Sequence, residues 1–189
     1  MNITVISSSG NPQSRSERIA LMCGDLLRAR GVETSFVKLT DCDLGRIAND
    51  EIIKGADFDR VHALTLQSDG LVLASPVYNW GCCSELKRYV ELIGSTNGQH
   101  RGAFFDKTLT FVNAAGLPHS YMSYLPLANS MMLDFKCVVN PYNVYVHNRH
   151  WDGDTLVAEA QSRINKSLDV MMQLTQLLAG RTYQSNWEI

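Results

Sequence analysis

Short runs of apolar residues alternate along the chain with longer segments in which apolar residues recur every three to four positions. The first run is Ile3–Ile6, and the helical spacing that follows it places apolar residues at Ile19, Met22, Cys23, Leu26 and Leu27. Short apolar runs are typical of strands buried on both faces, and 3.6-residue spacing is typical of amphipathic helices. Strands that alternate with helices predict βαβ units, and therefore a parallel sheet with helices on both faces.

The remaining elements keep this alternation. Further strands are predicted at Glu33–Leu39, Asp69–Ser75, Lys107–Asn113, Lys136–Val139 and Asn143–Val146. Further helices are predicted at Asp57–Gln67, from Ser84 onward, at Tyr121–Leu133 and at Thr155–Ala179. Pro126 fits the first turn of its helix if Ser123 caps that helix. Polar composition predicts a long loop over Thr40–Gly55 with at most a short helix, a loop over Gly94–Asp106 and a turn region over His147–Asp154.

The loop Ser7–Glu17, with the sequence SSSGNPQSRSE, joins the first strand to the first helix. A helix N-terminus offers unpaired backbone N–H groups and a partial positive charge. Ser9, Ser14 and Ser16 add hydroxyl donors and Arg15 adds a full charge, a combination that suits a phosphate group without a metal. The alternative is that Ser14 and Glu17 form only a capping box. The loop matches neither the dinucleotide fingerprint nor the Walker phosphate loop.

Two other unusual loops follow predicted strands, at Pro76–Gly81 and Asn113–Gly116. The first carries aromatic side chains, and the second presents little side chain at Ala114, Ala115 and Gly116. Parallel strands place the loops that follow them at one edge of the sheet, where ligands bind in open α/β folds. Together the three loops suit a ligand with a phosphate at one end and a flat, polar-edged ring at the other.

Composition narrows the function classes. The chain has 189 residues, which fits one α/β domain over residues 1–189. A formal net charge of -2 and the lack of a long basic run argue against nucleic-acid binding. No apolar segment is long enough to span a membrane and no signal peptide is recognisable, so we expect a cytoplasmic protein. The five Cys include no C-x-x-C pair, and no metal site is predicted; Cys82 and Cys83 are interpreted as small residues at a helix start.

Three motifs give the chain a resemblance to a known family. They are Ser9–Ser16, the segment Ser75–Trp80 followed by Ser84–Lys87, and the small residues of Asn113–Gly116. Over roughly residues 1–146 the chain resembles the NADPH-dependent FMN reductases, and among them the flavin reductases that serve two-component monooxygenases. Two family residues differ, since Ser8 replaces the usual Gly and Asn11 the usual Arg. One positive charge near the phosphate is therefore absent.

The resemblance implies a flavodoxin-like three-layer sandwich, in which a five-stranded parallel sheet of order 2-1-3-4-5 carries helices on both faces. It also implies non-covalently bound FMN and a homodimer or homotetramer. The phosphate would bind to the first loop, the isoalloxazine to the aromatic loop, and the ring edge to backbone of the third. The predicted cofactor-binding residues are Ser9, Asn11, Ser14, Arg15, Ser16, Pro76, Val77, Tyr78, Asn79, Trp80, Asn113, Ala115 and Gly116.

The activity that the resemblance implies is an NAD(P)H-dependent FMN reductase. A nicotinamide would stack on the flavin and pass a hydride to it, and reduced flavin or electrons would go to a second acceptor such as a partner monooxygenase. No catalytic side chain is predicted, because the flavin carries the chemistry. No basic cluster in the sequence marks a site for the 2′-phosphate that distinguishes NADPH from NADH, so the preference stays open.

Two other functions are compatible with the same loops. One is a quinone, azo-dye or chromate reductase that holds FMN permanently. The other is a flavodoxin-like electron carrier, although the chain lacks the T-x-T-G-x-T loop and its charge offers little steering toward basic partners. Single residues also have plainer interpretations: Tyr78 and Trp80 as dimer-interface aromatics, Asn79 as a turn residue, and His119 as a surface histidine.

Overall fold

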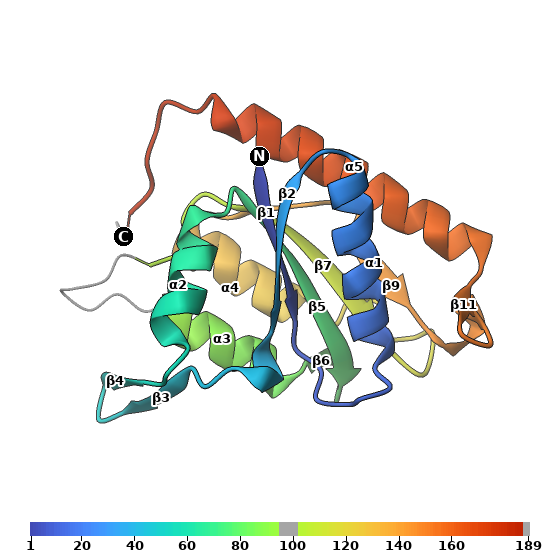
Figure 1. Cartoon of the computed structure of the whole chain (residues 1–189), viewed down its shortest axis with the longest axis horizontal. Helices are drawn as coiled ribbons and strands as arrows, with labels where there is room; N and C mark the ends of the chain where they lie inside the picture. The colour runs from blue at the N-terminus through green and yellow to red at the C-terminus, as the bar shows by residue number, and fades with distance from the viewer. Residues whose placement is uncertain (95–101, 187–189) are drawn as a thin grey trace.

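A parallel sheet forms the middle layer of the computed structural model, which describes residues 1–94 and 102–186 (Figure 1). Its strands are β1 (Asn2–Ser7), β2 (Glu33–Lys38), β5 (Gly70–Tyr78), β7 (Thr108–Ala114), β8 (Val138–Val139) and β9 (Val144–Val146). Hydrogen bonding orders them β2-β1-β5-β7, with β8 and β9 both parallel to β7. In chain order this is the predicted 2-1-3-4-5 arrangement, with the fifth strand in two pieces.

Asparagine side chains bridge the gap in the fifth strand. β8 pairs with the first residues of β7, and β9 pairs with the last three. Between them, Asn143 Oδ1 accepts from Phe111 N–H at 2.7 Å, and Asn140 Nδ2 donates to Thr110 Oγ1 at 2.9 Å. The Asn143 side chain takes over a hydrogen bond that a continuous strand would make to the backbone of β7, and Asn140 adds a side-chain bond to the same strand. The interruption that Pro141 predicts is therefore confirmed.

Five helices among the described residues cover the two faces of the sheet. The helices α1 (Arg15–Ala29) and α5 (Ala158–Ala179) lie on one face, and α2 (Phe58–Gln67), α3 (Ser84–Gly94) and α4 (Leu125–Phe135) lie on the other (Figure 1). Alternate strand residues point to opposite faces, so Ile3 and Val5 pack with α1 and α5 while Ile6 packs with α2, α3 and α4. The predicted three-layer flavodoxin-like sandwich is confirmed.

The prediction of a long loop over Thr40–Gly55 is wrong. This segment follows the short 3₁₀ helix η1 (Leu39–Asp41) and contains an antiparallel hairpin of β3 (Gly45–Ala48) and β4 (Glu51–Lys54). Its turn is formed by Asn49 and Asp50, both with positive φ, at 51° and 61°. Asn and Asp tolerate this region and favour two-residue hairpin turns. The polar turn residues therefore led to the prediction of a loop where a hairpin forms. Of the loop predicted at Gly94–Asp106, residues 95–101 lie outside the described residues.

The start of the last helix and the cap of α4 also differ from the sequence prediction. The last helix begins at Ala158, because Thr155–Leu156 form β11 and pair with β10 (Trp151–Asp152). Pro126 does lie in the first turn of α4, as predicted, but Ser123 does not cap that helix. The Ser123 hydroxyl accepts instead from Asn113 Nδ2 at 2.8 Å, which ties the loop before α4 to the end of β7.

Candidate functional site

The three unusual loops meet at the carboxyl edge of the sheet, toward the bottom of Figure 1. They surround an open cleft of about 280 Å³. Residues from all three loops and one later segment line it: Ser9, Asn11, Gln13, Ser14, Arg15, Ser16, Pro76, Val77, Tyr78, Ala114, Ala115, Gly116 and Asn148. The structure thus brings together ten of the thirteen residues that the sequence selects.

Ser14 begins α1 and fixes the first loop. Its side chain accepts from Glu17 N–H at 3.1 Å, which is the first half of the predicted capping box. The second half is absent: Ser14 N–H donates to Asn11 O at 3.0 Å, and the Glu17 carboxylate lies 3.2 Å from Lys38 Nζ. The cap uses the N–H of Glu17 and leaves the earlier N–H groups of the helix start without an intrahelical partner. Helix capping and anion binding by this loop are therefore compatible.

The first loop also keeps hydroxyl protons available. Ser9, Ser14 and Ser16 are buried, and Ser9 Oγ accepts from Asn11 N–H at 3.3 Å. Ser14 and Ser16 share one hydrogen bond of 2.9 Å, which uses only one of their two protons. Hydroxyls that act mainly as acceptors inside the protein retain donors for a ligand. This donor set suits a phosphate, whose oxygens are strong acceptors.

Arg15 is the one charged side chain among the described residues that line the cleft. Its guanidinium donates to Asn148 Oδ1 and lies 5.3 Å from the centre of the Trp151 ring. Nearby charges are already paired, since Arg18 forms an ion pair with Asp154. The positive charge expected at position 11 is supplied by no other residue of this lining. A phosphate here would meet one cation, neutral hydroxyls and backbone N–H groups.

The aromatic loop is shorter than predicted, because β5 continues through Pro76, Val77 and Tyr78. It then turns back into β6 (Gly81–Cys82), which pairs Val77 with Cys82 and Tyr78 with Gly81. Asn79 and Trp80 form the turn with positive φ, at 47° and 64°. Asn79 therefore closes a turn, as its plainer interpretation states. Neither residue lines the cleft, so their part in binding remains a prediction.

The third loop offers backbone close to the cleft. Ala114, Ala115 and Gly116 line it, as their small size predicts. Ala115 N–H donates to Val146 O at 2.9 Å, so Ala115 can offer a ligand only its carbonyl. Asn113 does not line the cleft: its side chain is buried and donates to Ser123 Oγ. A direct contact of Asn113 with a ligand remains a prediction, while its observed contact positions the loop.

Asn148, Gln13 and Ala114 line the cleft but are missing from the sequence prediction. Gln13 and Ala114 lie within loops that the sequence did select. Asn148 begins the 3₁₀ helix η2 (Asn148–His150), directly after β9. Because β9 is the last parallel strand, the segment after it must end at the same edge of the sheet. The sequence carries that signal, but the polar composition of the segment indicates only a turn.

Side chains with nucleophilic or metal-binding chemistry do not gather in this cleft. Burial raises the pKa of Cys82 to about 11, so this thiol stays protonated at neutral pH. Among the described residues, no three His, Cys, Asp or Glu side chains converge on a metal position. No helix in the described part of the chain has the length and apolar character needed to cross a membrane.

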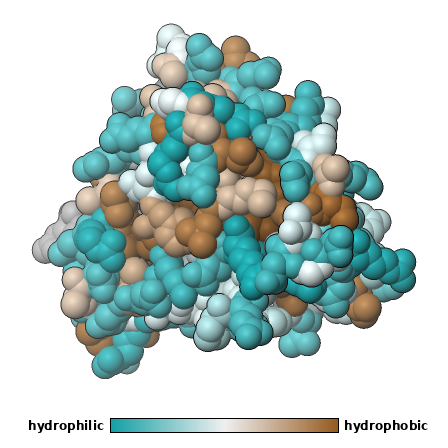
Figure 2. All heavy atoms as spheres, turned by 45° about the vertical axis from the view of Figure 1, so that its right-hand side comes forward, coloured by the Kyte–Doolittle hydropathy of each residue, from teal (hydrophilic) through white to brown (hydrophobic). Residues whose placement is uncertain are grey.

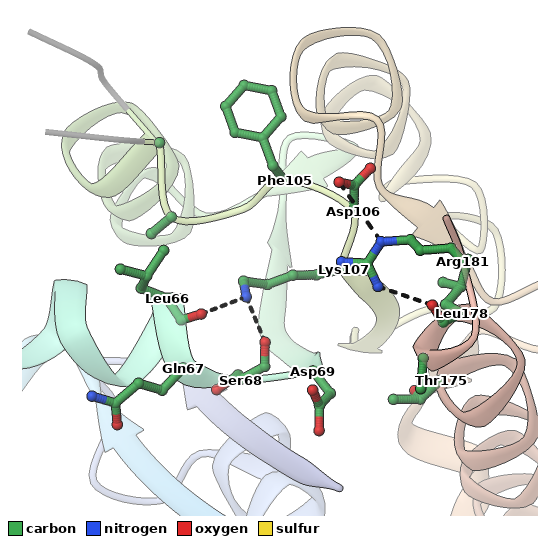
Figure 3. A pocket seen from close by; sticks show the side chains of 13 residues that line it. Leu66, Gln67, Ser68, Asp69, Phe105, Asp106, Lys107, Thr175, Leu178 and Arg181 are labelled. Atoms are coloured by element: carbon green, nitrogen blue, oxygen red, sulfur yellow. Dashed lines mark hydrogen bonds and ion pairs between the residues drawn. The ribbon is translucent and has the colours of Figure 1, made fainter. Parts of the chain in front are cut away.

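A second cavity, of about 200 Å³, lies at the opposite edge, where β5 and β7 begin (Figure 3). Lys107 reaches across it, and its Nζ donates to the carbonyls of Leu66 and Ser68. Asp106 accepts from Ser185 N–H at 3.0 Å and lies 3.8 Å from Arg181. The charged groups of Lys107 and Asp106 are thus occupied by backbone carbonyls and by the C-terminal segment, which favours a structural role over ligand binding.

Comparison with known proteins gives the family and the fold of the chain. A family model described as NADPH-dependent FMN reductase matches residues 1–151. No curated protein matches the chain. An oxidoreductase from Corynebacterium diphtheriae superposes with a TM-score of 0.74 at 20% identity, covering 96% of this chain and 98% of that one.

Two further solved structures show the same fold. The apo form of an NADH:FMN oxidoreductase, EMOB, has a TM-score of 0.73 at 18% identity, over 96% of this chain and 91% of that chain. FerB from Paracoccus denitrificans, an NAD(P)H:(acceptor) oxidoreductase, has a TM-score of 0.74 at 15% identity, over 93% and 97%. At these identities the likeness establishes the shared architecture.

Proposed function

Because the chain belongs to the NADPH-dependent FMN reductase family and is an NAD(P)H-dependent FMN reductase, we propose that the cleft at the carboxyl edge is its flavin site. The observation that carries this proposal is that hydroxyl donors and a rigid strand end line the same cleft. Ser9, Ser14 and Ser16 supply hydroxyl donors at a helix N-terminus, and Pro76, Val77 and Tyr78 supply a shelf beside them. FMN has a phosphate at one end, which suits the hydroxyl donors, and a flat ring at the other, which suits the strand end.

The phosphate end would be held by the first turn of α1. The buried hydroxyls of Ser9, Ser14 and Ser16 and the free N–H groups of the helix start would donate to phosphate oxygens, and Arg15 would supply the charge. Asn148 and Trp151 already hold the Arg15 guanidinium from its other side. This support pre-orients the guanidinium and lowers the entropy lost when it binds a phosphate.

The ring end would be held between two strand ends. Pro76 and Val77 continue β5, and Ala114 pairs with Pro76 across the sheet before the chain turns at Ala115. Proline lacks an N–H and fixes its backbone, so this shelf is rigid at the point where the ring would rest. Tyr78 and Gly116 are exposed at the rim, which leaves one face of a bound ring open to a second substrate.

When bound, FMN supplies the electron-accepting ring that takes a hydride from the nicotinamide. The protein's part is to position the two rings, since proximity and orientation supply most of the rate enhancement in such a step. We propose no general acid or base from this chain. The titratable thiol nearest the shelf, Cys82, has its pKa raised to about 11 by burial and cannot exchange protons readily at neutral pH.

We further propose that FMN exchanges with solution, as a flavin substrate does. A single cation faces the phosphate, and the cleft is open along Tyr78, Gly116 and Asn148. The alternative, a quinone, azo-dye or chromate reductase that retains its FMN, needs a tighter grip. Dialysis of FMN-loaded protein distinguishes the two: we expect colourless protein that regains NAD(P)H oxidation on addition of FMN. Yellow protein that keeps its flavin would favour the alternative.

The flavin site itself is tested by calorimetry with FMN and with riboflavin. We expect FMN to bind more tightly than riboflavin, because only FMN meets the first loop with a phosphate. Equal affinity for the two flavins, or no binding of either, would contradict the placement. A stable one-electron state during anaerobic titration would instead support an electron carrier of the flavodoxin type.

Assembly and partners extend the proposal. Large apolar side chains stand exposed on the molecule, among them Tyr78, which lines the cleft, and Trp80, Leu117, Tyr121 and Met122. Figure 2 shows that apolar residues gather in patches on one face of the molecule. Such patches favour a protein interface, so we propose a homodimer or homotetramer, to be measured by sedimentation. A partner monooxygenase would be detected by substrate oxygenation coupled to NAD(P)H consumption.

The cellular setting and the extent of the domain are also proposals. We propose a cytoplasmic protein, supported by five free cysteines in a structure without disulfides among its described residues. Fractionation of cells that express the protein tests it. We also propose one FMN-binding domain over the whole chain. Its support is that α5, which lies beyond the matched residues, packs on the core formed by α1, β7 and β9.

A further inference from the structure

Two loops that are distant in sequence lie side by side next to the flavin cleft. The Tyr145 hydroxyl of β9 binds the loop after β7, since it donates to Leu117 O and lies 2.9 Å from Ser120 Oγ. Ser120 N–H also donates to Tyr145 Oη, at 3.3 Å. These bonds fix the segment that contains His119 against the strand that leads into η2. Gly116 and Asn148, one from each loop, both line the cleft.

Four basic side chains gather where these loops meet: His119 from the loop after β7, and His147, Arg149 and His150 from the segment after β9. We call them the cationic rim. The His147 and His150 rings lie 3.9 Å apart. Burial, and then the positive neighbours His150, Arg149 and His119, lower the pKa of His147, which places all three within electrostatic reach of it.

The cationic rim has donors and no counter-charge. His147 Nδ1 accepts from Arg149 N–H, and His150 Nδ1 accepts from His147 N–H, each at 3.3 Å. These bonds put the proton of each neutral ring on Nε2, so each ring keeps one donor. Among the ion pairs of the described residues, none involves a rim side chain. Arg149 is always charged, and basic side chains without a carboxylate in ion-pair contact are a favourable place for an anion.

Resting on the proposed flavin site, we propose that the cationic rim binds the 2′-phosphate of NADPH and makes the enzyme prefer NADPH over NADH. In this proposal the nicotinamide stacks on the open face of the ring beside Gly116, and the rest of the nucleotide extends past Gly116 and Asn148, which line the cleft next to the rim. The FMN phosphate is already served by Arg15 and the first loop. The rim is therefore a second anion site, separated from the first by Asn148, which Arg15 holds.

Arg149 is the residue to test, because it is exposed and always charged. In Arg149→Ala we expect KM for NADPH to rise about tenfold while KM for NADH stays unchanged, as loss of one charge-assisted contact predicts. Arg149→Lys should recover part of the difference. The control is Arg46→Ala, another exposed arginine, on the β3–β4 hairpin at the far side of Figure 1, which should change neither KM.

A binding measurement on flavin-free protein separates this proposal from the flavin site. We expect adenosine 2′,5′-bisphosphate to bind more tightly than 5′-AMP by calorimetry, and the difference to disappear in a His119→Ala/Arg149→Ala double variant. FMN affinity should be unchanged in that variant. Equal binding of the two nucleotides to the wild-type protein, or equal effects of Arg149→Ala on NADPH and NADH, would overturn the rim as a 2′-phosphate site. If the wild-type protein does not bind FMN at all, the flavin site itself is refuted.

Discussion

The two ends of the sheet differ in the hydrogen bonding of their buried polar groups. At the amino end, Lys107 is 6% exposed and its ammonium group donates to two carbonyls, while Asp106 accepts from Ser185 (Figure 3). At the carboxyl end, Ser9 and Ser16 are 1% exposed, yet they border a cleft and keep protons to donate. Burial alone therefore does not identify a site. Buried donors that remain unused next to open space do, because they are satisfied only by a ligand or water.

Removing the cation at the amino end is expected to have the largest effect. Lys107→Met leaves the carbonyls of Leu66 and Ser68 without their donor, so the free energy of unfolding should fall by about 3 kcal/mol. Urea denaturation measures this loss. FMN affinity of the folded protein should stay within a factor of about two, since the cleft lies at the other end. A large loss of FMN affinity would show that the two ends are coupled.

Removing the cation at the carboxyl end should reverse that pattern. In Arg15→Met the phosphate loses its one charged partner, so the FMN dissociation constant should rise about 30-fold, or about 2 kcal/mol. Riboflavin affinity should not change, and the salt dependence of FMN binding should weaken. Stability should fall by less than about 1 kcal/mol, since exposed charged contacts contribute little. An equal loss for both flavins would place Arg15 away from the phosphate.

Two serines of the first loop separate capping from binding. Ser14→Ala removes the helix cap and a phosphate donor together, so we expect about 1 kcal/mol lower stability and weaker FMN binding. Ser16→Ala removes a hydroxyl that does not cap the helix, so FMN binding should weaken with little change in unfolding. Calorimetry and urea denaturation are read side by side. If both variants bind FMN as tightly as the wild-type protein, the loop caps the helix but does not bind the phosphate.

The smallest effect concerns a thiol at each end. Burial raises the pKa of Cys82, at the carboxyl end, to about 11 and that of Cys137, near Lys107, to about 12. Thiolate is the reactive form, so at about pH 8 Cys82 should react slowly with iodoacetamide and Cys137 only after unfolding. Peptide mass spectrometry over time gives the order. Rapid labelling of Cys82 would reopen a redox role for the Cys82–Cys83 pair.

Local chemistry explains which parts of the fold could be read from the sequence. The strands and the three loops follow from apolar runs and from the geometry of parallel strands, which few interactions can override. The strand order was predicted only by the resemblance to the family. The β3–β4 hairpin could not be recognised, because its strands are only half-buried and its turn uses Asn49 and Asp50 in place of glycine. The early start assigned to the last helix has a similar cause, since Thr155 and Leu156 pair with β10.

The candidate site was predictable as far as it is local. Ser14 and Arg15 follow from a loop at a helix start, and Pro76 and Gly116 from loops after strands. The position of Asn148 at this edge follows from the end of the last parallel strand, but the cationic rim was not predictable, because contacts across the fold assemble it. His119 and Arg149 are thirty residues apart in the sequence, and the Tyr145 hydroxyl holds the loop that contains His119 against the strand that leads to Arg149. Histidines scattered along a sequence carry no such information.

The broken fifth strand has a consequence for solubility. A long, regular strand at the border of a sheet can recruit the strand of another molecule and start aggregation. Here that border is divided into two short pieces, with Asn140 and Asn143 turned inward to satisfy β7. Pro141 between them offers no N–H to an incoming chain. The interruption therefore protects the molecule against edge-to-edge polymerisation, at a position where an unbroken strand would have invited it.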